Sequence, residues 1–262
     1  MLIFCKGLHR RVRRDMIPFE RQEFMLKEMK KGTVYIQELA KILSVSEITV
    51  RRDLKELEER NLITILRGGA AKLIDTTRET SMDQREGLYA KEKEQIGEYA
   101  ASLVKNGDVI FIDSGTTTKK MMKYLTRHKD IQIITNGYKN VEEGILYDLP
   151  VTLIGGELKR ETYAFIGPIT RKVIDMYYFD KCFLGANGIE KEFGLSNADP
   201  NESLIKEQVI HRSRKSYVVS DHTKFDSNSV FTFARLSEVE IITDLIPVGY
   251  SNDENIIVAH KE

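Results

Sequence analysis

Residues 46–54, with the sequence SEITVRRDL, contain side chains that could read a DNA duplex. On a helix, at 100° per residue, Val50, Leu54 and Leu57 fall on one side. The opposite side carries an aliphatic side chain, hydroxyl groups and basic side chains. An aliphatic group can contact a thymine methyl group, a hydroxyl can bond to a base edge or a phosphate, and an arginine can bond to guanine. We therefore expect DNA contacts from Ser46, Ile48, Thr49, Arg51, Arg52 and Lys55, and from Arg67 after the helix.

An ordinary amphipathic surface helix would explain the same charges without DNA, because a solvated face tolerates them. The neighbouring sequence favours a DNA-binding helix over an ordinary surface helix. Residues 20–31 and 36–43 have apolar residues at helical spacing, and a tight connection leads to Ser46, a good N-cap. Residues 62–73 form two short β-runs broken by Gly68-Gly69, as in a hairpin wing. Together these elements predict a winged helix-turn-helix, with Asp53 at the core edge as a structural partner for an arginine.

A second candidate site lies at FIDSGTTT, residues 111–118, where a β-run ends in an aspartate and a hydroxyl-rich turn opens a helix. Backbone N–H groups at a helix N-terminus, with hydroxyls beside them, can bind a phosphate without a metal. A well-capped strand–helix junction without a ligand has the same sequence. Both interpretations stay open from this segment alone.

Short apolar β-runs alternate with helical stretches from residue 108 onward, which predicts a parallel sheet with helices on both faces. Ligands bind such sheets outside the carboxyl ends of the strands. Small or polar residues follow several runs there, in ITNG, LIGGEL, GANGI and SDHTKF. Three basic residues, Lys206, Lys224 and Arg160, could neutralise a phosphate, and Asp113, Glu202 and Asp221 could accept hydrogen bonds from sugar hydroxyls. Turn geometry and surface charge are the alternative explanations.

Composition and charge distribution limit the classes of protein. The 262 residues suit two domains, and the net charge is zero. Through Leu73 there are 16 Lys and Arg against 10 Asp and Glu, which leaves 24 against 30 of the 40 of each. A basic first part fits DNA, although solvated charge produces similar asymmetry. The two cysteines are far apart without metal-ligand spacing, so we expect no disulfide, no metal and a reducing cytoplasm.

No apolar run approaches membrane-spanning length, so we expect no membrane contact. The basic opening, residues 1–19, could be an arm for the minor groove or a disordered tail. We interpret the residues before Met16 as an upstream extension from start-codon choice, because MIPFERQ begins a plausible start. N-terminal sequencing of the native protein tests this interpretation.

The motifs ERQ, S-x-x-T-V-R-R-D-L, LEERNLI and RGGA resemble the DeoR family of transcriptional regulators. The resemblance continues through EKEQIG, DVIFIDSGTTT, LIGGELKRETYAFIGP, LGANGI, E-S-x-x-K and SDHTKF, and so covers nearly all of the chain after residue 19. Two departures are visible. Arg67 and Ile65 stand where the family often has histidine and arginine, and GLSNADP, with Asn197 and Asp199, replaces a Thr-rich stretch.

The resemblance implies a sensor domain similar in fold to ribose-5-phosphate isomerase, with no cofactor, and repression relieved by a phosphorylated sugar. The effector-binding residues expected from the resemblance and the strand ends are Asp113, Ser114, Gly115, Thr116, Thr117, Asn136, Gly137, Gly155, Gly156, Arg160, Asn187, Glu202, Lys206, Asp221 and Lys224. Because one recognition helix reads few bases, we expect a homodimer or homotetramer on repeated half-sites of operator DNA.

The fold expected is α/β: a winged helix-turn-helix followed by a Rossmann-like parallel-sheet domain. We expect a basic N-terminal extension, a DNA-binding domain, a linker and a sensor domain at residues 1–19, 20–74, 75–89 and 90–262. The alternative function is a sugar-phosphate isomerase-like enzyme with an appended DNA-binding domain, because paired carboxylates and a lysine could move a proton. No nucleophile has an evident histidine partner and an isomerase needs no DNA-binding domain, so we expect a regulator rather than an enzyme.

Overall fold

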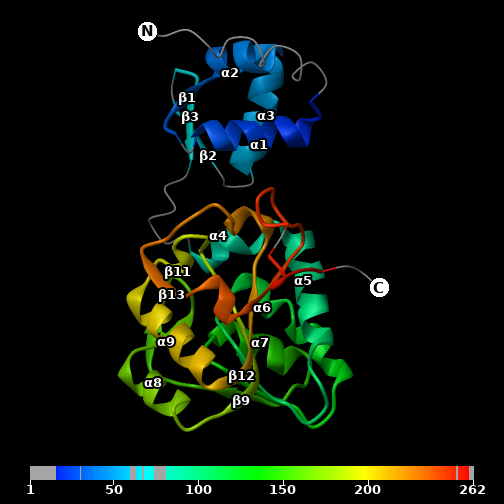
Figure 1. Ribbon diagram of the computed structural model, residues 1–262, viewed down its shortest axis with the longest axis vertical. Helices are drawn as coiled ribbons and strands as arrows, with labels where there is room; N and C mark the ends of the chain where they lie inside the picture. Colours follow the sequence, from blue (N-terminus) through cyan, green and yellow to red (C-terminus); the bar gives the residue numbers. More distant parts are fainter. Residues whose placement is uncertain are drawn as a thin grey trace. The chain divides into compact units, whose positions relative to one another are not determined.

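The chain is described by a computed structural model that covers residues 16–29, 31–59, 63–66, 68–73, 81–251 and 253–259. Contacts divide the chain into two compact units, residues 1–76 and 77–262, and each is described by itself (Figure 1). Three parts of the predictions lie outside the described residues: Arg67, the extension before Met16, and residues 75–80 of the linker.

The first unit contains three helices, α1 (Pro18–Met29), α2 (Ile36–Leu43) and α3 (Glu47–Glu59). Their apolar stripes meet in one core, in which the side chains with at most 1% exposure include Met25, Leu39, Leu43, Val50, Leu54 and Leu57. The predicted helical periodicity is therefore confirmed, because the residues at helical spacing are the ones that pack together.

A small antiparallel sheet completes this unit. Strands β2 (Ile63–Leu66) and β3 (Ala70–Leu73) pair as the predicted wing, and the turn between them contains Gly68 and Gly69 at φ 90° and 78°. These values lie in the left-handed region that glycine adopts without steric cost. The sequence did not reveal β1 (Val34–Tyr35), which pairs with β3 and makes the sheet three-stranded.

The second unit is built on a seven-stranded, wholly parallel sheet in the order β15-β14-β12-β9-β4-β5-β6. Six of these strands coincide with the predicted β-runs, and the edge strand β15 was not predicted. Their bounds are β4 (Val109–Ile112), β5 (Gln132–Thr135), β6 (Val151–Leu153), β9 (Phe179–Leu184), β12 (Ser213–Val219), β14 (Glu240–Thr243) and β15 (Ile256–Val258).

Helices cover both faces of this sheet, as predicted (Figure 1). Successive strand residues point to opposite faces. Ile110 and Ile112 accordingly pack in the core against α5 (Ala90–Ser102) and the 3-10 helix η1 (Met122–Arg127), whereas Phe111 packs in the core against α8 (Pro168–Ile174) and α9 (Pro200–His211). Helix α7 (Tyr138–Leu146) contacts η1. The result is a three-layer α/β unit, with the sheet packed between helices on both faces.

Shorter elements surround the strand ends of the second unit. The sequence did not predict the hairpin β7 (Glu157–Lys159) and β8 (Ala164–Ile166), the sheet of β10 (Gly188–Glu190), β11 (Gly194–Asn197) and β13 (Phe231–Ala234), or the helices α4 (Met82–Glu86), η2 (His222–Lys224) and η3 (Leu236–Glu238). Of these, α4 forms within the stretch that the sequence assigns to a linker. The helix predicted after Gly115 is present as α6 (Thr116–Lys119), followed by η1.

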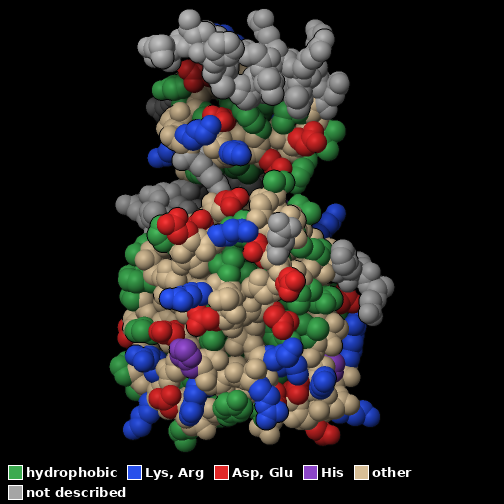
Figure 2. Space-filling view, in the orientation of Figure 1, with side chains coloured by type: hydrophobic (Ala, Val, Ile, Leu, Met, Phe, Trp, Pro, Cys, Tyr) green, Lys and Arg blue, Asp and Glu red, His purple; other side chains and the backbone are tan. Residues whose placement is uncertain are grey.

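Acidic and basic side chains are interspersed over the visible face of the second unit (Figure 2). Among the described residues, no helix has both the length and the apolar composition needed to cross a bilayer. Cys182 is a free thiol buried in the core.

Candidate DNA interface and effector site

The third helix begins with a side-chain cap that the sequence predicted. Ser46 Oγ accepts a hydrogen bond from the Thr49 N–H at 3.1 Å, and the two hydroxyls lie 2.9 Å apart. Before it, Ser44 adopts φ 56° and ends α2, so the chain turns tightly between α2 and α3. This is the tight connection of a helix-turn-helix.

One face of α3 is exposed and carries the predicted DNA-contacting side chains together. Ile48 is 79% exposed, so its aliphatic side chain lies on the surface of this unit. Arg51, Arg52 and Lys55 are exposed beside it, and Thr49 is half-buried. Arg51 lies 3.9 Å from Glu47, an exposed ion pair that costs little to break. The face is therefore available to a partner.

The opposite side of α3 is fixed by a buried ion pair. Arg21 of α1 donates from Nε to Asp53 Oδ2 at 2.8 Å and from Nη2 to Oδ1 at 3.1 Å. Asp53 is fully buried, and Arg21 also donates to the Met16 carbonyl oxygen. This confirms the predicted structural role of Asp53, and its bidentate geometry fixes the rotation of α3 relative to α1.

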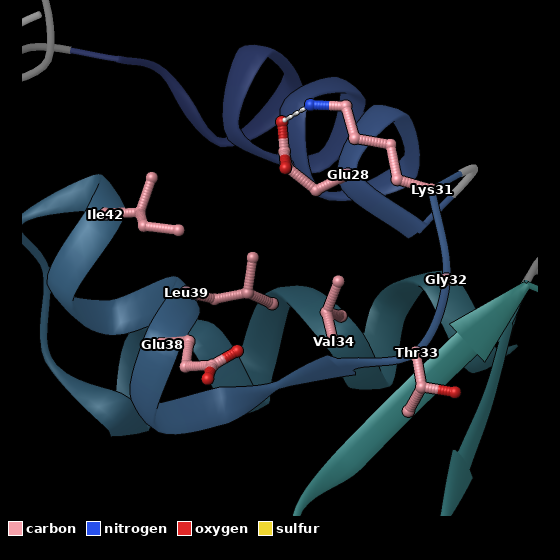
Figure 3. A pocket seen from close by; sticks show the side chains of 8 residues that line it. All are labelled: Glu28, Lys31, Gly32, Thr33, Val34, Glu38, Leu39 and Ile42. Atoms are coloured by element: carbon pink, nitrogen blue, oxygen red, sulfur yellow. Dashed lines mark hydrogen bonds and ion pairs between the residues drawn. The ribbon is translucent and has the colours of Figure 1, made fainter. Parts of the chain in front are cut away.

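A groove of about 210 Å³ lies elsewhere in this unit, between the end of α1, the start of the sheet and α2 (Figure 3). Val34, Leu39 and Ile42 give it apolar walls, and Glu28 and Lys31 form an ion pair at its rim. None of the described residues predicted to contact DNA lines this groove, which is therefore separate from the exposed face of α3.

In the second unit the strand order reverses between β4 and β9. From β4 the chain adds β5 and β6 on one side, and then β9, β12, β14 and β15 on the other. Ligands of parallel α/β sheets bind at the carboxyl end of the strands at such a reversal. Asp113 follows β4 and Gly185 follows β9, and the Gly185 N–H donates to Asp113 Oδ2 across the reversal at 3.0 Å.

Asp113 and Lys206 form a buried ion pair at this point, with side-chain exposures of 5% and 3%. Burial raises the pKa of the Asp113 carboxyl, and the ammonium group of Lys206 opposes that effect. Lys206 comes from α9, so the pair connects this helix to the end of the central strand. Two charged groups removed from water are costly to maintain, which marks the position as a candidate site.

Glu202, one turn before Lys206 on α9, is the centre of a second buried group. Its carboxylate accepts hydrogen bonds from Thr162 at 2.6 Å and from Asn197 at 2.7 Å, and Lys159 lies 3.4 Å away. Lys159 also lies 3.1 Å from Asp199, whose side chain caps α9. The structure thus brings residues of β7, β11 and α9 together beside Asp113.

The turn after β4 is joined to the turn after β5. The Asn136 side chain accepts from the Ser114 N–H at 3.3 Å and donates to the Phe165 carbonyl, while Ser114 Oγ donates to the Thr162 carbonyl at 2.6 Å. A Cβ on Gly137 would lie 3.0 Å from Ser114 Cα, so glycine permits this close approach. Ser114, Asn136 and Gly137 therefore lie together, as predicted.

Asp221 and Lys224 follow β12 at the same edge of the sheet. Asp221 is fully buried; burial would raise its pKa, but Lys224, the Thr223 hydroxyl and Lys93 together lower it. Lys93 of α5 is 4% exposed and donates to the Arg85 carbonyl at 2.6 Å. Burial lowers the pKa of Lys93 to about 8.

The remaining residues predicted to bind the effector lie in other environments than these charged groups. Thr116 and Thr117 are buried in α6, a helix of four residues capped by the backbone of Gly115. Asn187 is half-buried and donates its backbone N–H to Ser196. Arg160 is exposed and has no ion pair with a described residue, and Gly155 lies in open space. A Cβ on Gly156 would lie 2.1 Å from Thr170 Oγ1, so this glycine permits packing against α8.

Sequence reasoning missed three polar residues of this region: Thr162 and Lys93, which are buried, and Lys159, which is half-buried. Lys159 is the neighbour of the predicted Arg160, and only the alternation along the β7 strand distinguishes which of the two turns inward. Lys93 lies three and four residues before Ile96 and Gly97, on the buried stripe of α5. A lysine on an apolar helical stripe was the signal that could have identified it.

Residues 21–77 match the DeoR-like helix-turn-helix domain family, and residues 89–245 match the DeoR C terminal sensor domain family. The chain is 39% identical over 229 residues to the "Uncharacterized HTH-type transcriptional regulator FruR" of Bacillus subtilis, covering 87% of this chain and 91% of the relative. It is 36% identical over 219 residues to the "Glycerol-3-phosphate regulon repressor" of Escherichia coli, covering 82% and 86%.

Among solved structures, ribose 5-phosphate isomerase A of Methanocaldococcus jannaschii matches with 18% identity and a TM-score of 0.38, over 51% of this chain and 53% of that one. A likeness at this level supports no inference about the site. The two family matches, by contrast, cover most of the chain in the order DNA-reading unit, then sensor unit. This protein belongs to the DeoR family of DNA-binding transcriptional regulators.

Proposed function

We propose that this regulator represses genes of carbohydrate catabolism and that a phosphorylated sugar changes its affinity for operator DNA. In this proposal it acts in the cytoplasm as a homodimer or homotetramer, and it does not turn its effector over. The observation that carries the proposal is the gathering of buried charged side chains, Asp113, Glu202, Lys206 and Asp221, at the carboxyl edge of the parallel sheet. One relative is named for a glycerol-3-phosphate regulon, and this name supports a phosphorylated metabolite as the effector.

On the DNA side, Arg51, Arg52 and Lys55 are assigned to the major groove with Thr49 and Ile48. The support is the exposure of this face together with the burial of the opposite face of α3. Arg67 is assigned to the same interface from the sequence alone. Ser46 acts indirectly, because its hydroxyl caps α3 and orients Thr49.

On the effector side, the charges favour one orientation of the ligand. Around Glu202, three carboxylates, Asp113, Asp199 and Glu202, face two lysines, Lys159 and Lys206. An excess of carboxylates suits sugar hydroxyls, which donate hydrogen bonds, and repels a phosphate. We therefore assign the sugar hydroxyls to this side.

The phosphate is assigned to the other side of the strand ends. There three basic side chains, Lys93, Lys224 and Arg85, lie near two carboxylates, Asp221 and Glu86. The turn at residues 114–117 offers hydroxyl and backbone N–H groups. Lys224 is half-buried and acts electrostatically on Asp221, and we assign its ammonium group to the phosphate. This orientation distinguishes the roles of Glu202 and Lys224.

The alternative, a sugar-phosphate isomerase, is favoured by one observation: the Asp113–Lys206 pair beside Glu202 could serve proton transfer. The names of the relatives support the regulator, since they describe transcriptional regulators and repressors. Interconversion of phosphopentoses or phosphohexoses by the purified chain at enzymatic rates would contradict our proposal.

A thermal-shift screen tests the effector class, because a ligand that binds the folded state raises its unfolding temperature. We would use ribose 5-phosphate, fructose 1-phosphate, fructose 6-phosphate and glucose 6-phosphate, each beside its unphosphorylated sugar. We expect a shift with at least one phosphorylated compound and none with its parent sugar. The Lys224→Ala variant should lose that shift, whereas Lys105→Ala, which changes an exposed lysine before β4 at the opposite end of that strand from Asp113, should keep it. Equal shifts with and without the phosphate would contradict the proposed effector class.

A further inference from the structure

Helix α4 is the first described element after the DNA-reading unit, and eight residues of the chain separate it from the end of β3. It has only five residues and begins with a capping box, in which Ser81 and Gln84 exchange hydrogen bonds of 3.3 Å. Isolated helices of this length are not stable in water. Contacts with the rest of the second unit must therefore hold α4 in place.

The first set of contacts joins α4 to residues 161–163. The Met82 N–H donates to the Glu161 carbonyl at 2.7 Å, and the Tyr163 hydroxyl donates to Asp83 Oδ2 at 3.0 Å. Between these two residues, Thr162 points the opposite way: its hydroxyl donates to Glu202, and its carbonyl accepts from Ser114. Three consecutive residues thus bind α4 on one side and the proposed effector site on the other.

The backbone of Tyr163, in the segment that contacts α4, adopts an unusual conformation. Its φ is 52°, in the left-handed region that a bulky residue rarely adopts. Its carbonyl is held by the structure around it, since it accepts a hydrogen bond from the Tyr138 N–H at 2.9 Å. Such conformations persist where the surroundings enforce them and are frequent at functional sites.

Two further contacts join α4 to the other parts of the proposed site. Glu86 forms an ion pair with Lys119 of α6, the helix that follows the Asp113 turn. The Arg85 carbonyl accepts a hydrogen bond from Lys93, which lies within electrostatic reach of Asp221 and Lys224. Helix α4 therefore contacts one neighbour of each part of the proposed site: the segment of Thr162 beside Glu202, Lys119 after the Asp113 turn, and Lys93 beside Asp221 and Lys224.

We propose that α4 is the relay between the two units: occupancy of the effector site alters the contacts of residues 161–163, α6 and Lys93 with α4, and α4 in turn biases the linker to the DNA-reading unit. This inference rests on the proposed function, because it needs an effector at that site. A ligand that bonds Glu202 competes with the Thr162 hydroxyl, and one that bonds Lys224 changes the charge around Lys93. A marginal helix held by such contacts is a suitable two-state element.

Tyr163→Phe is the sharpest variant, because it removes one hydroxyl from an exposed hydrogen bond and leaves the packing unchanged. The matched control is Tyr178→Phe, at a tyrosine that is 59% exposed and whose hydroxyl bonds to none of the described residues. Amide hydrogen exchange of the full chain without ligand is the first measurement. We expect faster exchange in Tyr163→Phe at residues 82–87 and also at residues 113–117, with no change in the control. Faster exchange at residues 82–87 alone would overturn the relay.

The second measurement is coupling, which a purely structural role of Tyr163 would not alter selectively. DNA selected by the chain from a random pool is titrated with and without fructose 1-phosphate, or whichever of the four tested sugar phosphates gives the largest thermal shift. In the parent chain we expect this probe to change DNA affinity about 5-fold or more. In Tyr163→Phe the change should fall below about 2-fold, while probe affinity and DNA affinity measured separately stay within about 2-fold of the parent.

The outcomes separate the two proposals. If none of the four sugar phosphates binds the parent chain, the proposed effector class fails, and the exchange experiment still decides whether α4 is linked to residues 113–117. If the probe binds and Tyr163→Phe keeps the full coupling, the relay is overturned while the proposed function stands. Loss of coupling in Tyr178→Phe as well would also overturn it, since the effect would then not depend on α4.

Discussion

Arg52 extends from the exposed face of α3 and forms no ion pair with a described residue. A bidentate contact between an arginine and guanine discriminates against other bases by about 1–3 kcal/mol. We therefore expect Arg52→Ala to weaken binding to the selected DNA by about that amount, measured by fluorescence anisotropy at fixed salt. Lys105→Ala, which removes an exposed charge from the second unit, should leave the affinity unchanged. An Arg52→Ala chain that binds as tightly as its parent would remove this residue from the interface.

The lowered pKa of Lys93 predicts that the stability of the folded chain depends on pH. Burial lowers its pKa to about 8 in the folded chain, from an ordinary value of 10.5. Between these two pH values the unfolded chain binds more protons than the folded chain, so this lysine makes the free energy of unfolding rise with pH. Its contribution to the slope is at most about 1.4 kcal/mol per pH unit.

The Lys93→Met variant tests that dependence. We expect the free energy of unfolding, measured with urea from pH 8 to 10.5, to rise less steeply in the variant than in the parent chain. Lys105→Met supplies the control, because that lysine is exposed and its loss should not alter the slope. Parallel curves for Lys93→Met and the parent would show that Lys93 keeps its ordinary pKa in the folded state.

At the scale of elements, α5 is held very close to the chain segment that precedes η1. A Cβ added to Gly97 would lie 2.7 Å from Lys120 Cβ and 2.8 Å from the Lys120 carbonyl carbon. Alanine favours a helix by about 1 kcal/mol relative to glycine, but overpacking against backbone costs about 1–3 kcal/mol. We expect Gly97→Ala to lower the free energy of unfolding in a urea titration. At Gly87, where no atom lies within 4 Å, the same substitution should be neutral or slightly stabilising.

The long elements could be predicted from sequence because their periodicity reports burial directly. The stripe Val50, Leu54 and Leu57 defines α3, and the β-runs of the sheet are buried on both faces, so their residues are nearly all apolar. Short elements lack such a signal. The two residues of β1 and the five of α4 are ordered by partners distant in sequence, β3 and residues 161–163.

The same distinction applies to the candidate site. Residues at the ends of strands, such as Asp113 and Asp221, could be named from the parallel sheet alone, because all carboxyl ends meet at one edge. Lys159 and Thr162 reach Glu202 through the hairpin β7–β8, whose position depends on tertiary packing that the sequence does not display. The pairing of Asp113 with Lys206, 93 residues apart, has no local signal either.

At the scale of the whole molecule, the zero net charge is the sum of two opposite charges carried by different parts of the chain. The basic excess lies before residue 74, and the acidic excess lies in the rest of the chain. Association with DNA is therefore expected to be strongly salt-dependent, because phosphate contacts release counterions. The acidic second unit is kept from binding DNA non-specifically by the same electrostatics.

Linkage between the two units supplies the last prediction. If one equilibrium connects effector binding to DNA binding, the factor by which the sugar phosphate changes DNA affinity must equal the factor by which DNA changes sugar-phosphate affinity. We expect the two factors to agree within error, with the first measured by anisotropy at saturating probe and the second by calorimetry with and without saturating DNA. Both titrations need the same salt and the same oligomeric state, checked by light scattering. Two reproducibly different factors under those conditions would contradict a single linked equilibrium and, with it, a relay that has only two states.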